Sequence, residues 1–64
     1  MDRDTVVEAA EDAYRLYAEY VTENVDLEQP MLPWRDLPKV YQCAWVSATV
    51  AVLDRAAPEW WRAS

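Results

Sequence analysis

The 64-residue sequence contains no glycine, no histidine and no phenylalanine, and it has one cysteine, Cys43. Without glycine, the chain cannot form a Gly-rich loop that cradles a phosphate. Without histidine and with one cysteine, it cannot form a zinc finger, a His-based catalytic triad or a disulfide framework. Cys43 lies in an apolar stretch with no histidine to activate it, so we expect a buried structural cysteine.

Basic residues are also scarce. Six Lys and Arg stand against twelve Asp and Glu, which gives a net charge of −6. Residues 1–29 carry nine acids and two bases, and residues 30–64 carry three acids and four bases. Nucleic-acid binding needs clustered Lys and Arg, and anionic lipid attracts the same residues. We therefore expect no nucleic-acid partner and no membrane partner.

Membrane-spanning and leader segments are not expected either. The longest uncharged stretch runs from Val40 to Leu53, which is shorter than the roughly 18–20 residues that span a bilayer. The first residues, Met1-Asp2-Arg3-Asp4, do not resemble a signal peptide. With a single cysteine, these features favour a cytoplasmic protein.

Residues 5–23 have the pattern of an amphipathic helix. Thr5 followed by Glu8 forms a capping box, which predicts the helix start at this point. On a helical wheel the charged side chains share an arc of about 120°, and apolar side chains fill an unusually wide arc of about 200°.

A loop is predicted over residues 24–36, because Pro30 and Pro33 cannot occupy a helix interior. The loop is long for a connection between helices. It is also rather apolar, so we expect its side chains, Trp34 included, to fold back over the helices.

A second helix is predicted over residues 37–57. Asp36 is the expected N-cap, Pro38 fits the first turn, and Pro58 ends the helix. Apolar side chains surround this helix, which is the pattern of a helix buried on all sides. Trp45, two turns inside, is expected to meet the tyrosine-rich face of the first helix.

Together these elements predict an all-α fold: an antiparallel helical hairpin in a single domain, residues 1–64, with residues 58–64 forming a short helical turn. A chain below about 70–80 residues rarely gains more than about 3–5 kcal/mol from its own core. We therefore expect a homo-oligomer, most simply a two-fold dimer that completes a helical bundle. The candidate oligomer contacts are Tyr17, Tyr20, Val46, Val50 and Leu53.

Two surfaces are candidates for contact with another protein. The first is the acidic arc of the first helix, although a merely solvated helix face has the same pattern. The second is the aromatic tail, since Trp and Arg dominate interface hot spots. The candidate contact residues are Glu8, Glu11, Asp12 and Glu19 on the helix, and Trp60, Trp61 and Arg62 in the tail.

Two Trp-Arg pairs allow a different interpretation. An aromatic plane beside a guanidinium suits a nucleotide, because the ring stacks on the base and the guanidinium binds phosphate. Trp34, Arg35, Trp61 and Arg62 are therefore a candidate ligand pocket between protomers. In the alternative reading, Trp34 plugs the loop onto the helices, and the tail tryptophans cap the end of the bundle.

Three short motifs follow one another between Ala13 and Ala51: A-Y-x-x-Y at 13–17, P-W-x-x-L-P at 33–38 and A-W at 44–45. This pattern resembles short, mostly uncharacterised proteins of phages and prophages. The resemblance implies a helix–loop–helix unit and a viral or prophage setting. It implies no catalytic residues.

These observations favour a small, acidic, non-enzymatic protein that binds and modulates a host protein, in host takeover or in anti-defence. Two alternatives stay open: an oligomeric sponge that sequesters a nucleotide signal, and a minor structural component of the virion. No set of nucleophile, base and orienting group is present, so an enzyme is not expected. No cofactor or metal is expected.

Overall fold

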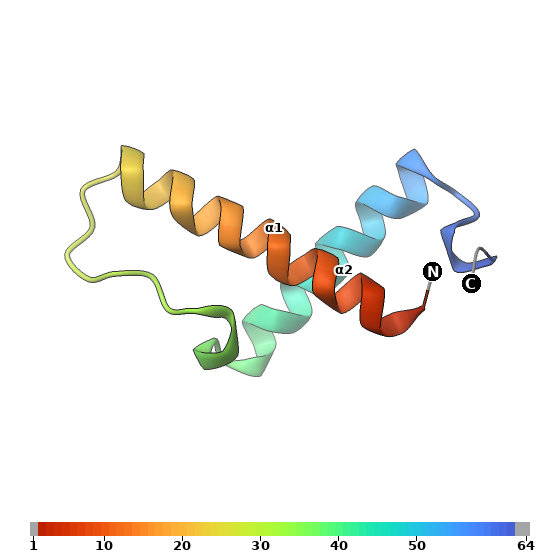
Figure 1. Cartoon of the computed structure of the whole chain (residues 1–64), viewed down its shortest axis with the longest axis horizontal. Helices are drawn as coiled ribbons and strands as arrows, with labels where there is room; N and C mark the ends of the chain where they lie inside the picture. The colour runs from red at the N-terminus through yellow and green to blue at the C-terminus, as the bar shows by residue number, and fades with distance from the viewer. Residues whose placement is uncertain (1, 63–64) are drawn as a thin grey trace.

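The computed structural model describes residues 2–62 and consists of four helical elements. In chain order these are α1 (Arg3–Asn24), the 3-10 turn η1 (Trp34–Asp36), α2 (Lys39–Ala56) and the 3-10 turn η2 (Trp60–Arg62). No β-strand occurs among these residues. The predicted all-α helical hairpin is confirmed, and Figure 1 shows that its two helices cross as an X.

The N-terminus of α1 differs from the prediction. The N-cap is Asp2 and not Thr5, so the cap lies three residues earlier than expected and the helix begins at Arg3. An Asp2 carboxylate oxygen accepts hydrogen bonds from the Thr5 backbone N–H (2.8 Å) and from the Thr5 hydroxyl (2.9 Å). Thr5 is therefore the third residue of the helix, and it uses its side chain to support the cap instead of providing it.

The start of α2 also needs a correction. Asp36 is not an N-cap, because it ends the η1 turn, and Pro38 takes the cap position without a side-chain cap. The Pro38 carbonyl accepts hydrogen bonds from the backbone N–H groups of Tyr41 (2.9 Å) and Gln42 (3.2 Å). The predicted loop thus contains a 3-10 turn. The tail forms a short helical turn as expected, with residues 63–64 lying outside the described range.

The core is very small. Of residues 2–62, only Val6, Ala10 and Tyr14 are buried, and all three lie on one stripe of α1. No residue of α2 is buried, which corrects the expectation of a helix enclosed on all sides. Instead α2 has one half-buried stripe, consisting of Gln42, Trp45, Val46, Thr49, Val50 and Leu53. The spacing of these positions is that of one helix face, as expected when a single helix crosses another.

The molecule is flat and extended. Its principal extents are 43 × 21 × 14 Å, and its Cα radius of gyration is 13.3 Å. A compact chain of this length has a radius of gyration of about 10.7 Å. The crossing of the helices therefore leaves much of each helix without a neighbour from the same chain.

Candidate functional site: an apolar groove with an acidic rim

Four aromatic rings join the two helices and the loop. The Tyr14 and Trp45 ring centroids lie 5.6 Å apart in an edge-to-face arrangement, and those of Tyr17 and Trp45 lie 5.2 Å apart. Trp34 of η1 lies 6.0 Å from Tyr14. These contacts confirm that Trp45 meets the tyrosines of α1. They also show that Trp34 packs against Tyr14 and so connects the loop to α1.

Two hydrogen bonds hold the loop against the helices. The Tyr14 hydroxyl donates to the backbone carbonyl of Leu32, and the Gln42 side-chain amide donates to the carbonyl of Trp34 over 2.7 Å. The first bond joins α1 to the loop, and the second joins α2 to η1. The segment 30–35 is therefore fixed alongside α1, although most of it is not helical.

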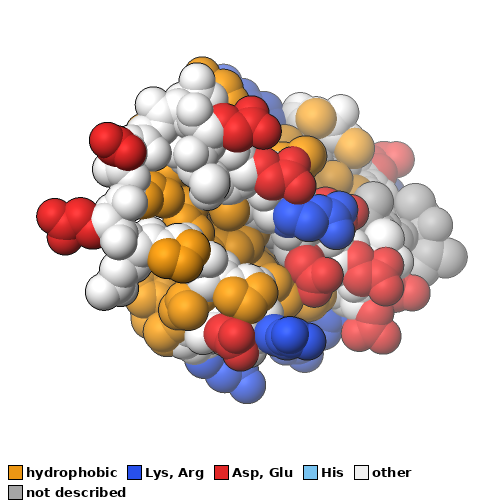
Figure 2. Space-filling model, turned by 60° about the vertical axis from the view of Figure 1, so that its left-hand side comes forward, with side chains coloured by type: hydrophobic (Ala, Val, Ile, Leu, Met, Phe, Trp, Pro, Cys, Tyr) orange, Lys and Arg blue, Asp and Glu red, His pale blue; other side chains and the backbone are white. Residues whose placement is uncertain are grey.

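Between α1 and this segment lies a groove of about 630 Å³. We call it the α1–loop groove. Figure 2 shows hydrophobic side chains gathered on this side of the molecule, with charged side chains around their margin. The loop contributes Pro30, Met31, Leu32, Pro33, Trp34 and Arg35, and α1 contributes Glu11, Tyr14, Arg15, Ala18, Glu19, Thr22 and Glu23.

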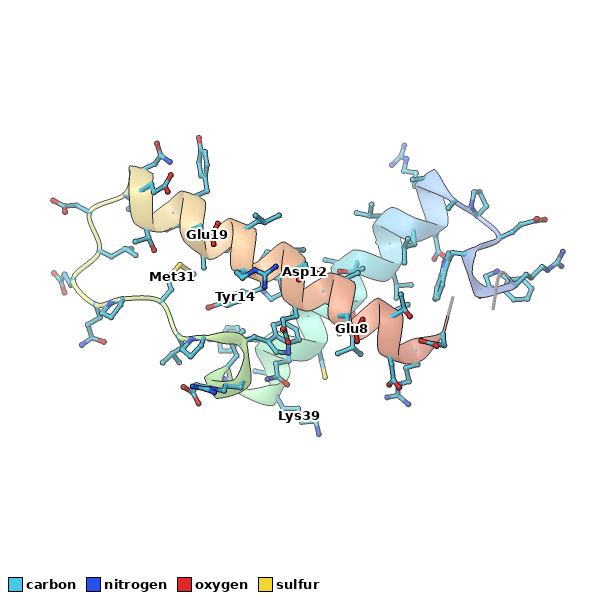
Figure 3. The ribbon with its side chains drawn as sticks, in the orientation of Figure 1. Glu8, Asp12, Tyr14, Glu19, Met31 and Lys39 are labelled. Carbon is cyan, nitrogen blue, oxygen red and sulfur yellow. The ribbon has the colours of Figure 1, made fainter. Side chains whose placement is uncertain are left out.

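The groove explains why the loop is apolar. In Figure 3 the Met31 side chain and the Tyr14 ring lie in the space between α1 and the loop. Met31 is half-buried, whereas Leu32 is half exposed. Sequence reasoning did not assign Met31, Leu32 or Pro33 to a site, although their apolar character was the signal that could have identified them.

The structure divides the predicted acidic contact residues into two groups. Glu11 and Glu19 line the groove together with Glu23, whereas Glu8 and Asp12 do not line it. Asp12 instead accepts a 2.9 Å hydrogen bond from Arg15 within α1. The groove therefore combines an apolar floor with carboxylates along its helical side.

A second hollow of about 440 Å³ shares Tyr14, Met31 and Leu32 with the groove. Its other lining residues are Tyr17, Leu37, Pro38, Tyr41 and Trp45. None of these residues is Asp, Glu, Lys or Arg. Its apolar surface is thus a continuation of the aromatic cluster, and Tyr17 and Tyr41 remain largely exposed around it.

The candidate nucleotide pocket does not form within one chain. Trp34 and Arg35 line the α1–loop groove, whereas Trp61 and Arg62 line neither hollow. The two pairs flank opposite ends of α2, whose 18 residues span about 27 Å. Figure 1 shows η1 and η2 far apart.

The tail tryptophans differ in their environment. The Trp60 indole N–H donates a 2.7 Å hydrogen bond to the Asp54 carboxylate, and the ring is half-buried. Trp61 is exposed, and the Arg62 guanidinium lies 4.6 Å from its ring centroid. Trp60 therefore anchors the tail to α2, as expected of a capping residue, and Trp61 is the part of the tail that remains accessible.

The candidate oligomer contacts fall into two groups that differ in burial and lie on different helices. Val46, Val50 and Leu53 lie on the half-buried stripe of α2 that includes Trp45, whereas Tyr17 and Tyr20 are exposed on α1. Cys43 is exposed, which corrects the expectation of a buried cysteine. The reason is that Cys43 lies on the side of α2 that α1 does not cover.

Within residues 2–62, no three His, Cys, Asp or Glu side chains are grouped so that they could hold a metal ion. Neither helix combines the length and hydropathy that crossing a bilayer requires. Comparison of the chain with protein-family models, with curated proteins and with solved structures gives no match.

Proposed function

We propose that the chain is a non-enzymatic interaction protein that binds a basic, partly apolar segment of another protein in the α1–loop groove. The observation that carries the proposal is the apolar floor of the groove, which has Glu11, Glu19 and Glu23 along its helical side. Apolar surface drives association, and the carboxylates select a segment that carries Lys or Arg.

The charge distribution supports the same choice of partner. The nine acids and two bases of residues 1–29 give this half of the chain a charge of −7. Arg15 and Arg35 also line the groove, and Arg15 is paired with Asp12. The field around α1 therefore attracts a cationic partner and repels an anionic one.

The resemblance to short phage and prophage proteins sets the biological frame of the proposal. In that setting the partner is a protein of the host cell. The interaction takes place in the cytoplasm, where it serves host takeover or anti-defence.

The test uses a labelled peptide that forms a basic amphipathic helix of Leu and Lys, with fluorescence anisotropy as the measurement. The intact chain should bind this peptide, and a Leu/Glu peptide of the same pattern should not bind. The double variant Glu11→Lys/Glu19→Lys should weaken binding by about tenfold or more, since two attractive pairs become repulsive.

A matched control is available on the same helix. Asp4→Lys/Glu8→Lys changes the charge by the same amount, but neither residue lines the groove. This control should change the affinity by less than about threefold at about 0.15 M salt, because neither carboxylate touches a segment held in the groove and salt weakens the remaining attraction. Equal losses in both double variants would assign binding to the whole acidic face. No binding of the Leu/Lys peptide would contradict the proposal.

A further inference from the structure

The outer face of α2 is an apolar surface that this chain leaves uncovered. It extends from the edge of the half-buried stripe beside Trp45 to the side of α2 opposite that stripe, and it includes Val40, Tyr41, Ala44, Ala48, Ala51 and Val52. Val40 is 69% exposed, Tyr41 58% and Val52 65%. No charged residue occurs between Lys39 and Asp54. None of these residues lines the α1–loop groove, although Tyr41 lines the second hollow beside it.

The exposed surface area of the chain indicates how much surface a second molecule would have to cover. A compact monomer of 7.5 kDa exposes about 4,250 Å². This chain exposes 5301 Å², which is about 1,000 Å² more. Each partner in a stable complex of ordinary size buries about 800 Å². The excess is therefore close to what one protomer of a stable dimer covers.

We infer that a second copy of the chain covers this face, with the two α2 helices packed antiparallel about a two-fold axis. The alanines at 44, 48 and 51 allow the two helices to approach closely. Val40, Tyr41 and Val52 would then be removed from water by the same surface of the other copy, as a two-fold interface requires.

One basic residue on the outer face of α2 favours the antiparallel direction. Arg55 follows Ala51 by four residues and Ala48 by seven, which places it at the C-terminal end of this face. A parallel pair would place Arg55 beside Arg55, which is unfavourable. An antiparallel pair, with its two-fold axis at the level of Val46 and Ser47, holds the two Arg55 side chains at opposite ends of the interface. Antiparallel helices also align their dipoles favourably.

The first experiment is sedimentation equilibrium of the full chain at micromolar concentration, with circular dichroism to confirm folding. The expected mass is twice the 7.5 kDa of one chain. Ala44→Glu should raise the dissociation constant about 100-fold or more, because it buries an unpaired carboxylate from each copy. Ala56→Glu, an exposed alanine of the same helix that lies off this face, should leave the dimer intact.

Mixing the wild-type chain with the Arg55→Glu variant tests the direction of packing, with native mass spectrometry as the measurement. In an antiparallel pair the two positions are far apart, so mixed and unmixed dimers should form with affinities that agree within about twofold. A strong preference for the mixed dimer would show that the two positions are adjacent, and it would overturn the antiparallel direction.

A disulfide cross-link tests the same interface without a buried charge, and it applies even if Ala44→Glu prevents folding. In a Cys43→Ser background, Ser47→Cys places a thiol beside the two-fold axis, within reach of its copy. Oxidation should give a disulfide-linked dimer, whereas Ala56→Cys in the same background should not. A folded wild-type monomer, a dimeric Ala44→Glu variant or an uncross-linked Ser47→Cys variant would each overturn the inference.

Discussion

At the scale of single residues, Tyr14 connects the most parts of the molecule. Its ring contacts Trp34 of η1 and Trp45 of α2, and its hydroxyl donates to the Leu32 carbonyl in the loop. It is also one of the three buried residues of the described chain. Tyr14 thus positions the floor of the α1–loop groove as well as the helix crossing.

Replacing Tyr14 by Phe should remove the hydrogen bond to Leu32 while keeping the ring contacts. We expect a loss of about 1 kcal/mol in the free energy of unfolding, measured by urea denaturation. Tyr20→Phe is the matched control, because the Tyr20 ring is exposed. A stability loss in the control equal to that of Tyr14→Phe would show that the hydroxyl of Tyr14 contributes nothing specific.

At the scale of elements, the two helices begin in different ways. Asp2 caps α1 through its side chain, whereas Pro38 precedes α2 without a side-chain cap. The hydrogen bonds from the Thr5 backbone and side chain lower the pKa of Asp2 from its ordinary value of 3.8. Ionised Asp2 is thus favoured in the folded helix.

This lowered pKa makes the first turn of α1 sensitive to acid. A carboxylate with a lowered pKa in the folded state stabilises that state above its ordinary pKa and loses this effect as the pH falls through the folded value. Asp2→Asn caps a helix equally well but does not titrate near this pH. In far-UV circular dichroism, the wild-type chain should lose more helix than Asp2→Asn below about pH 4. Identical pH profiles would contradict the assignment of this cap.

At the scale of the whole molecule, shape and charge separate two surfaces. The α1–loop groove lies between α1 and residues 30–35, and the outer face of α2 contributes nothing to it. The two proposed interactions, with a partner segment and with a second copy, therefore do not compete for the same residues. The negative charge of −7 is confined to residues 1–29, so self-repulsion is concentrated along α1.

Salt should stabilise the protein for this reason. Raising sodium chloride from about 10 mM to about 1 M shortens the Debye length from about 30 Å to about 3 Å, which screens repulsion among the acids of α1. We expect the thermal midpoint to rise by a few degrees, and to rise less in Glu8→Gln, which removes one of these charges. A midpoint that falls with salt would show that attractive charge pairs dominate instead.

Sequence reasoning located the helices well and their first residues less well. Periodicity and the prolines placed two helices, a long loop and a tail turn close to their observed positions. The starts were wrong because capping depends on which side chain reaches which N–H, and in the structure the Asp2 carboxylate accepts from the Thr5 N–H. Of the acidic contact residues named from the sequence, Glu11 and Glu19 line the groove, which the sequence itself did not indicate.

The sequence by itself determined that the chain is helical, that one helix is acidic on one side, and that the other carries no charge between Lys39 and Asp54. These properties follow from residue order alone, because they depend on periodicity and charge. The tertiary structure decided which apolar residues are covered. The helices cross instead of lying along each other, so Trp45 and Val46 pack within the chain while Cys43 and Val52 stay exposed. A crossing angle arises from contacts distant in sequence, such as those of Tyr14 with Trp34 and Trp45, and no local pattern encodes it.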